Sequence, residues 1–178
     1  MKTKLLGLLL LTAASSAVQA QGAYIGGKLM NFDTTIKTGI GDFSSSPSGF
    51  AVFAGAEIAP SLALEATFLV NGNEDNIDQS AKLNIDNYYD FSAVAKARLS
   101  RQVEISGRVG IASLKWKDSL NYTASGTGPT VAGAASFYLS NQVRFFAEYQ
   151  FLPDAEFDDN SGDTISSSAF NIGASVHF

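Results

Sequence analysis

Charged residues in this chain recur at positions from which they could pair with one another inside a fold. They fall in segments where polar and apolar residues alternate, and within each segment they share one parity. Bases and acids are nearly balanced in this set, which consists of Lys28, Glu57, Glu65, Lys96, Arg98, Glu104, Arg108, Arg144 and Glu148. Buried charges are tolerated when they are paired and hydrogen-bonded. The pattern therefore predicts ion-pair chemistry, either as a static polar plug or as a selectivity element in a small pore.

General acid–base catalysis has one obvious candidate in the sequence. His177 is the only histidine, and histidine is the residue most often used as a general acid or base. By parity it lies on the polar side of its segment, and no serine or acid forms a recognisable catalytic motif with it. We therefore predict no catalytic residue.

An acidic segment near the C-terminus has some features of a calcium loop. The stretch PDAEFDDNSGD places Asp154, Glu156, Asp158 and Asn160 at alternate positions. However, Asp159 occupies the position where such a loop needs glycine, and no Glu closes the site. We expect a solvated acidic loop, which divalent ions could link to phosphate groups, and neither a resident metal nor another cofactor.

The first twenty residues have the composition of a secretory signal peptide. Lys2 and Lys4 form a basic start, the apolar run LLGLLLLTAA follows, and small residues lead to Ala20. The apolar run is too short to remain as a transmembrane helix, which needs roughly 20 apolar residues. We expect residues 1–20 to be removed and residues 21–178 to form one domain.

Overall composition excludes two classes of protein. The chain carries a net charge of −5 and contains no cysteine. An acidic chain lacks the basic face that nucleic acid requires, and a chain without cysteine has no disulfide framework. The fold must therefore be held together by strand pairing and packing.

Two-residue alternation recurs in eight segments, and this pattern is typical of β-strands. The expected strands are 22–32, 49–58, 62–70, 88–98, 103–115, 131–139, 143–152 and 168–178. Short polar breaks predict tight turns, and they recur every forty residues at 59–61, 99–103 and 139–143. Four longer segments rich in Gly, Ser, Asn, Asp or Thr predict loops at 33–48, 71–87, 117–130 and 153–167.

An even number of strands, with short turns at one end and long loops at the other, is typical of a transmembrane barrel. Strands of about 9–11 residues cross the bilayer core, and closing the sheet removes its edges. A charge on the lipid face costs about 2–4 kcal/mol, so the apolar rows must face lipid and the charged rows the interior. The predicted fold is all-β: an eight-stranded antiparallel up-and-down transmembrane β-barrel with short periplasmic turns and long extracellular loops.

Aromatic residues near the strand ends fit the two interfaces of a membrane. The terminal stretch FNIGASVHF has an apolar row that is expected to face lipid, namely Phe170, Ile172, Ala174, Val176 and Phe178. Phe178 should lie near the periplasmic interface. At the opposite end, we expect Trp116, Tyr88, Tyr89 and Tyr122 to form an interfacial aromatic belt.

Three short motifs carry a family resemblance. They are YIGGKL at 24–29, with its Tyr-x-Gly-x-Lys-Leu pattern, AEYQF at 147–151, and the terminal Phe178. With the hairpin rhythm they resemble the small eight-stranded outer-membrane barrels, above all the transmembrane domain of OmpA and more loosely OmpX. The first two are similar to the family's first and seventh strands. Phe178 resembles the C-terminal signal that the barrel-assembly machinery binds.

The resemblance implies an interior ion-pair network that can act as a gate. Lys28 matches the gating lysine of the first strand, and Glu65 matches its acidic partner on the third. Lys96, Arg108 and Glu148 match further interior charges.

Two departures from the family pattern limit the network's alternatives. Ser136 and Phe146 stand where OmpA carries an interior acid and an interior arginine, so a Lys28–Glu65 pair would have fewer other partners. The assembly signal carried over from the family comprises Phe170, Ile172, Val176 and Phe178. The sequence contains no peptidoglycan-binding domain, and no tethering role is expected.

The function expected from these features is that of a non-enzymatic outer-membrane barrel with a polar, salt-bridged lumen, contributing to envelope integrity and surface contact. One alternative is a narrow gated pore for ions or small solutes. Another is a lipid A-modifying enzyme, but it would need a catalytic group at the outer leaflet, and His177 lies at the other end. A third is a soluble lipocalin-like ligand-binding barrel. Charge balance, loop asymmetry and Phe178 weigh against it.

The expected location is the outer membrane of a Gram-negative bacterium, reached through the cleaved signal peptide. The expected partners are outer-membrane lipids and lipopolysaccharide, with the barrel-assembly machinery and periplasmic chaperones during biogenesis. The loops could carry a surface ligand that their composition does not identify. We expect a monomer.

Overall fold

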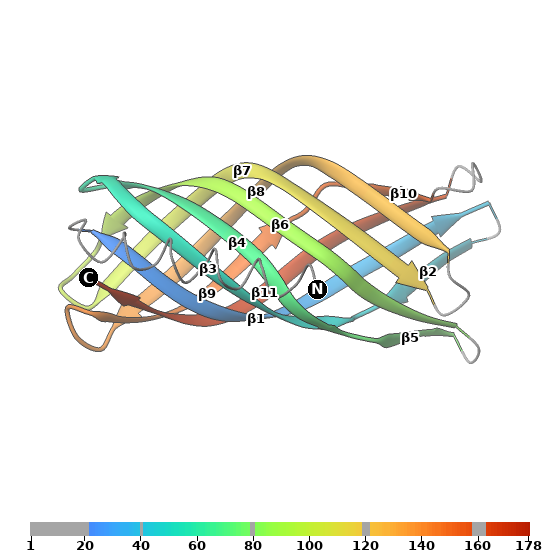
Figure 1. Cartoon of the computed structure of the whole chain (residues 1–178), viewed down its shortest axis with the longest axis horizontal. Coiled ribbons are helices and arrows are strands. Elements are labelled where there is room, and N and C mark those ends of the chain that lie inside the picture. The colour runs from blue at the N-terminus through green and yellow to red at the C-terminus, as the bar shows by residue number, and fades with distance from the viewer. Residues whose placement is uncertain (1–21, 40, 79–80, 119–121, 158–162) are drawn as a thin grey trace, which may run out of the picture.

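The chain folds into one antiparallel sheet that closes on itself. The computed structural model describes residues 22–39, 41–78, 81–118, 122–157 and 163–178, so the predicted signal peptide lies outside the described residues. The described residues form eight long strands: β1 (Ala23–Thr38), β3 (Ser48–Ala59), β4 (Leu62–Asn73), β6 (Ala81–Arg98), β7 (Val103–Asp118), β8 (Thr123–Tyr138), β9 (Val143–Phe151) and β11 (Thr164–His177). Sequence neighbours pair antiparallel, and β11 pairs with β1 to close the ring (Figure 1). The predicted barrel is confirmed. The described residues include no helix both long and apolar enough to cross a bilayer.

The tight turns lie at one end of the barrel, here called the turn end. In two of them a serine hydroxyl accepts hydrogen bonds from the backbone of its own turn. In the β6–β7 turn, the Ser100 Oγ accepts hydrogen bonds from the backbone N–H of Gln102 and Val103 at 3.2 and 3.0 Å. In the β8–β9 turn, the Ser140 Oγ does the same for the backbone two and three residues ahead. A serine hydroxyl that satisfies the backbone in this way stabilises a turn, so the LSRQV and LSNQV repeats have a direct structural cause.

The segments predicted as long loops are largely strand, which corrects the sequence-based expectation. At this opposite end, here called the loop end, β1, β6, β7, β8 and β11 run beyond the predicted bounds (Figure 1). Three short strands add to them: β2 (Gly41–Ser45), β5 (Asp75–Asp78) and β10 (Ala155–Phe157). β2 folds back on β1, β5 pairs with β6, and β10 lies between β8 and β11.

Apolar side chains inside the loop end explain why these polar-looking segments are ordered. Inward positions at this end, both in the predicted strands and in their extensions, carry buried apolar residues, and these form one continuous cluster, here called the upper core. Its larger members are Met30, Phe32, Ile36, Leu83, Ile85, Tyr88, Leu114, Trp116, Leu152 and Ile165. The ring of Trp116 meets that of Phe32 edge to face at 5.3 Å between centroids. Average composition marked these segments as loops, whereas inward residues such as Ile36, Leu83, Ile85 and Ile165 belong to a core.

Trp116 and Tyr88 therefore do not form an interfacial belt as expected. Both side chains are completely buried inside the barrel. Tyr89 does lie on the outer surface, as does Tyr122. The sequence-based interpretation failed for the buried pair because it weighed their position along the strand and not their parity.

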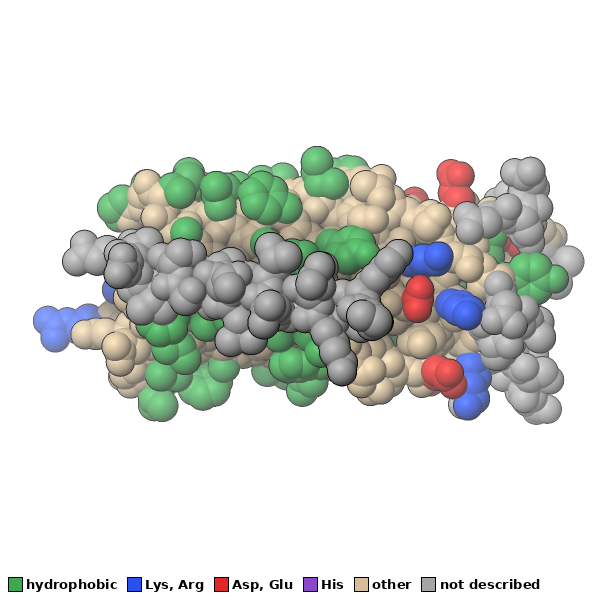
Figure 2. All heavy atoms as spheres, in the orientation of Figure 1, with side chains coloured by type: hydrophobic (Ala, Val, Ile, Leu, Met, Phe, Trp, Pro, Cys, Tyr) green, Lys and Arg blue, Asp and Glu red, His purple; other side chains and the backbone are tan. Residues whose placement is uncertain are grey.

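The outer surface of the barrel carries the predicted apolar rows. Phe91 is 61% exposed and Ile111 is 64% exposed, and the same outward row continues on every long strand. Figure 2 shows these side chains spread along the barrel wall, while charged side chains gather toward the loop end. On β11, Phe170, Ile172 and Val176 face outward, and the Phe178 N–H donates to the Ala23 carbonyl at 2.8 Å. Their role as an assembly signal stays a prediction.

We predict that the upper core contributes to stability as a soluble core does. Leu114→Ala should lower the free energy of unfolding by about 2–5 kcal/mol, because it removes a fully packed side chain. Trp116 is the only tryptophan and lies in the same cluster, so its fluorescence can follow denaturant unfolding of the refolded barrel. The matched control is Lys115→Ala, an exposed neighbour on β7 that should change stability by less than about 0.5 kcal/mol. Equal effects of the two changes would contradict a packed interior.

Candidate functional site

Five buried charged residues meet at mid-height inside the barrel. They are Lys28 on β1, Glu65 on β4, Asp90 on β6, Arg108 on β7 and Glu148 on β9, here called the central cluster. Each projects inward because it shares the inward parity of its strand. The cluster joins five strands and spans the chain from residue 28 to residue 148.

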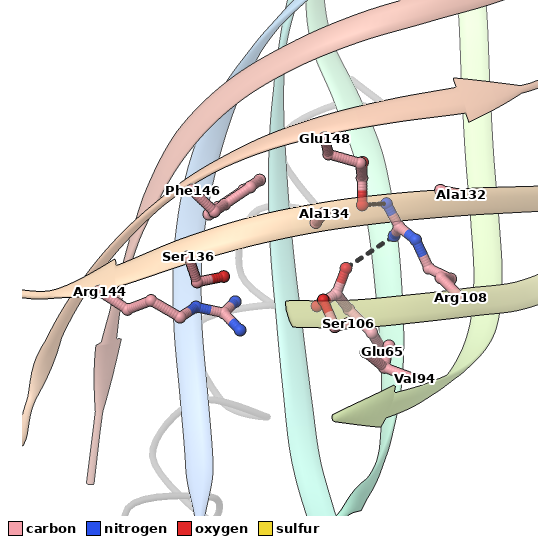
Figure 3. Close-up of a pocket in the computed structure, with 10 residues that line it drawn as sticks. All are labelled: Glu65, Val94, Ser106, Arg108, Ala132, Ala134, Ser136, Arg144, Phe146 and Glu148. Atoms are coloured by element: carbon pink, nitrogen blue, oxygen red, sulfur yellow. Dashed lines mark hydrogen bonds and ion pairs between the residues drawn. The ribbon is translucent and has the colours of Figure 1, made fainter. Parts of the chain in front are cut away.

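Arg108 is the centre of this cluster. Its Nη1 donates to Glu65 Oε1 at 2.7 Å, and its Nη2 donates to Glu148 Oε2 at 2.5 Å (Figure 3). The Asp90 carboxylate lies 3.6 Å from the same Nη1. Charge-assisted bonds from one planar guanidinium to separate carboxylates fix both distance and orientation. Arg108 therefore links β4 and β9 across the interior.

The lysine expected to pair with Glu65 has a different partner. Lys28 Nζ donates to Glu148 Oε1 at 3.1 Å, and among the described residues its ion pair is with that carboxylate. Glu65 is occupied by Arg108 and by the Tyr24 hydroxyl, which donates to its Oε2 at 3.1 Å. The Lys28–Glu65 pair implied by the resemblance is therefore not formed in this structure, because Arg108 and Tyr24 bind Glu65 while Lys28 binds Glu148. The role of these residues as a gate stays a prediction.

Asp90 was not among the residues singled out from the sequence. Its carboxylate accepts hydrogen bonds from Ser92 at 2.7 Å, Gln150 at 3.1 Å and Tyr88 at 3.3 Å. Neutral donors therefore satisfy much of its hydrogen-bonding capacity. Sequence alternation could have identified Asp90, since it shares the inward row of Lys96 on the same strand.

A second group of charges lies near the turn end. Lys96 Nζ donates to Glu57 Oε1 at 2.9 Å, so Lys96 is not part of the central cluster. Glu104 accepts a hydrogen bond from Tyr138 at 3.2 Å and lies 3.7 Å from Arg98 and 3.8 Å from Arg144. The predicted inward charges thus divide into two groups.

An aromatic layer lies between the two charged groups over part of the barrel's cross-section. Tyr24, Phe53 and Phe146 pack together with Ala63 and Val94. The ring of Phe53 meets that of Phe146 edge to face at 5.5 Å. Phe146 replaces an interior arginine of the resembled family, and here it contributes to this layer.

His177 lies inside the turn end, as its parity predicted. Its ring stacks on Tyr24 at 4.8 Å, and its Nε2 lies 3.2 Å from the Ser175 Oγ. The sequence interpretation found no serine motif, so this contact was missed. Ser175 is buried and also accepts a hydrogen bond from Arg144 Nε at 3.1 Å. A serine–histidine pair needs a third group that orients the histidine, and no carboxylate of the described residues is hydrogen-bonded to His177.

A small cavity lies between Arg108 and Arg144 (Figure 3). Its volume is about 20 Å³, enough for roughly one water molecule. Ala132, Ala134 and Ser136 of β8 form one wall, so the short side chain of Ser136 leaves this space open. The buried Nε of Arg108 has no partner among the described protein atoms. The described residues contain no group of His, Cys, Asp or Glu side chains that could hold a metal.

Comparison with known proteins places this geometry in a family. The chain matches the model of the "Outer membrane protein beta-barrel domain" over residues 5–178. Neisserial surface protein A is similar in structure, with a TM-score of 0.64 and 14% identity over 89% of this chain and 98% of that one. AlkL gives a TM-score of 0.59 and 11% identity over 89% and 91% of the two chains.

The attachment invasion locus protein Ail of Yersinia pestis is also similar, with a TM-score of 0.55 and 16% identity over 89% of this chain and all of that one. No curated protein sequence matches the chain. Similarities at these identities demonstrate a shared fold, whereas the family model covers nearly the whole sequence. The chain therefore belongs to the outer membrane protein beta-barrel domain family.

Proposed function

We propose that this protein is a non-enzymatic outer-membrane barrel whose lumen is closed by its own side chains. In this role it contributes to envelope integrity and offers its loop end for surface contact. The observation that carries the proposal is the bridge from Arg108 to both Glu65 and Glu148, with Lys28 bound to the same Glu148. These bonds cross the lumen, so they occupy the path that a solute would take.

Two layers of apolar packing support a closed lumen. The upper core fills the interior on the loop side of the central cluster, and the aromatic layer of Tyr24, Phe53 and Phe146 fills it on the turn side. An eight-stranded barrel is just wide enough for side chains to fill. The ion pairs therefore lie between two apolar layers, with one water-sized cavity beside Arg108, and breaking them there is expensive.

Surface contact would take place through an acidic face. The described side chains at the loop end include more acids than lysines: Asp33, Asp42, Glu74, Asp75, Asp86, Asp154, Glu156 and Asp163 against Lys37, Lys82, Lys115 and Lys117. This balance favours cationic partners, or lipopolysaccharide phosphates joined through divalent ions. The proposed partners in assembly are the barrel-assembly machinery and periplasmic chaperones, after export by the signal peptide, and the proposed state is a monomer.

A narrow gated pore is the second candidate, favoured by one observation. The cavity beside Arg108 adjoins the carboxylates of Glu65 and Glu148, so a small displacement of Arg108 could enlarge it. A lipid A-modifying enzyme has less support, because the Ser175–His177 contact lies at the turn end, away from the outer leaflet.

Conductance measurements distinguish a closed barrel from a gated pore. We expect the refolded wild type and Glu65→Ala to give no discrete single-channel events in a planar bilayer. The upper core would still seal the lumen after Arg108 loses one partner. Discrete conductance that appears or changes selectivity in Glu65→Ala would instead identify the Arg108–Glu65 pair as a gate. Folding of both proteins is checked by the shift in gel mobility on heating.

Stability measurements test the central role of Arg108. Arg108→Met should lower the free energy of unfolding by about 3–5 kcal/mol, because it leaves buried carboxylates unpaired. Adding Glu65→Gln should restore part of this loss. The control is Lys82→Met, which removes the exposed ion pair with Glu74 and should cost at most about 1 kcal/mol. A small effect of Arg108→Met would show that the cluster does not hold the barrel together.

Ligand binding tests the acidic loop end. Ail has been crystallised in complex with the heparin analogue sucrose octasulfate. This chain should not bind that polyanion at physiological salt, because its loop end is acidic, and titration calorimetry of the detergent-solubilised barrel can measure this. Lysine substitution of Asp33, Asp42 and Glu156 should create weak binding. Micromolar binding by the wild type would overturn the proposed preference for cationic partners.

A further inference from the structure

An open hollow lies at the turn end, between the β6–β7 and β8–β9 turns. Its volume is about 630 Å³. The two turns lie side by side because β7 and β8 pair up to Val103 and Phe137, and the Tyr138 N–H donates to the Gln102 carbonyl at 2.8 Å. The lining residues that matter here are Arg98, Ser100, Arg101, Tyr138, Ser140 and Asn141.

Two arginines give the hollow a positive charge. The guanidinium of Arg98 lies over the Tyr138 ring at 4.8 Å and 3.7 Å from Glu104, yet 63% of its side chain is exposed. The Arg98 guanidinium is thus held in place while some of its N–H groups still face solvent. Arg101 lies in the β6–β7 turn, is exposed, and has no carboxylate within ion-pair distance among the described residues. Guanidinium groups presented in this way match phosphate geometry.

The serines of the two turns add oriented donors. Each serine Oγ accepts two backbone N–H groups of its own turn, so its single hydroxyl proton remains available for an outside acceptor. Because the turn fixes both hydroxyls, binding would require little further ordering. The hollow therefore offers hydroxyl donors beside its guanidinium groups.

The rim of the hollow continues into the lipid-facing surface. Leu99 is 64% exposed and Leu139 is 68% exposed, and each directly precedes the serine of its turn. Val103 and Phe137 extend this apolar ridge along the outside of the barrel. A ligand that places an anion in the hollow would therefore lay any attached alkyl chain against these side chains.

We propose that this hollow binds the phosphate of an anionic phospholipid in the periplasmic leaflet of the outer membrane. Arg98 and Arg101 would contact the phosphate, the two serine hydroxyls would donate to its free oxygens, and an acyl chain would pack on Leu99 and Leu139. Each basic residue near an anionic lipid surface strengthens binding about fivefold. This site is independent of the central cluster and of the acidic loop end.

The test is a lipid-retention experiment on the refolded barrel. The barrel in detergent is mixed with equimolar phosphatidylglycerol and phosphatidylcholine, and native mass spectrometry counts the lipids retained. The wild type should retain phosphatidylglycerol preferentially. Arg101→Gln should weaken retention about fivefold, and Arg98→Gln with Arg101→Gln should abolish the preference. Arg101→Lys should retain most of it.

The matched control is Lys117→Gln, which removes the same charge from the exposed surface of the loop end. It should leave lipid retention unchanged. An equal loss in Lys117→Gln would show that net charge, and not the hollow, attracts the lipid, and this would overturn the proposal. Displacement of the lipid by an equal concentration of inorganic phosphate would also overturn it, because the acyl chain would then contribute nothing. The heat shift in gel mobility verifies folding of every variant.

Discussion

Closure of the backbone between the first and last strands is the constraint on which the rest of the structure depends. In lipid, an unpaired N–H or C=O group has no water to bond with, so an open sheet edge is prohibitively expensive. β1 and β11 remove that edge with a continuous register from Tyr24↔His177 to Lys37↔Thr164. Because this ladder extends past the apolar band, closure holds at the loop end as well. Every inward side chain must then pack or pair within a narrow ring.

The interior meets that demand by layering its side chains. Charges at the turn end are followed by aromatic rings, then by the central cluster, then by the upper core. Glycines leave the space that the aromatic rings occupy. A Cβ on Gly55 would collide with the Tyr24 ring, and one on Gly173 would lie 2.5 Å from Phe146 Cζ. The glycines thus admit the aromatic layer. That layer and the upper core leave the ion pairs of Arg108 only a cavity of about one water molecule, and this low exposure to water raises the energy of breaking them.

Alternation along each strand made the barrel and its inward charges predictable, because parity is a local property of the chain. The partner of each charge was not predictable, since partners come from distant strands: Lys28 bonds to Glu148, and Arg108 takes Glu65. The loop end was misjudged for a different reason. Average composition hid a period of two in which residues such as Leu83 and Ile85 alternate with polar ones, and only their burial inside the closed ring reveals them as core.

Because the described part of the loop end is ordered strand and not flexible loop, surface contact by the protein would not require these segments to become ordered. A barrel with flexible loops must order them when a partner binds, and that ordering weakens the complex. Here the described strand extensions are paired through β2, β5 and β10 and packed on the upper core, so much of the acidic surface is already fixed by the fold. Surface carboxylates such as Asp33 and Asp154 lie on this rigid wall. A cationic partner would therefore meet a preformed charge pattern whose stability derives from apolar residues directly beneath it.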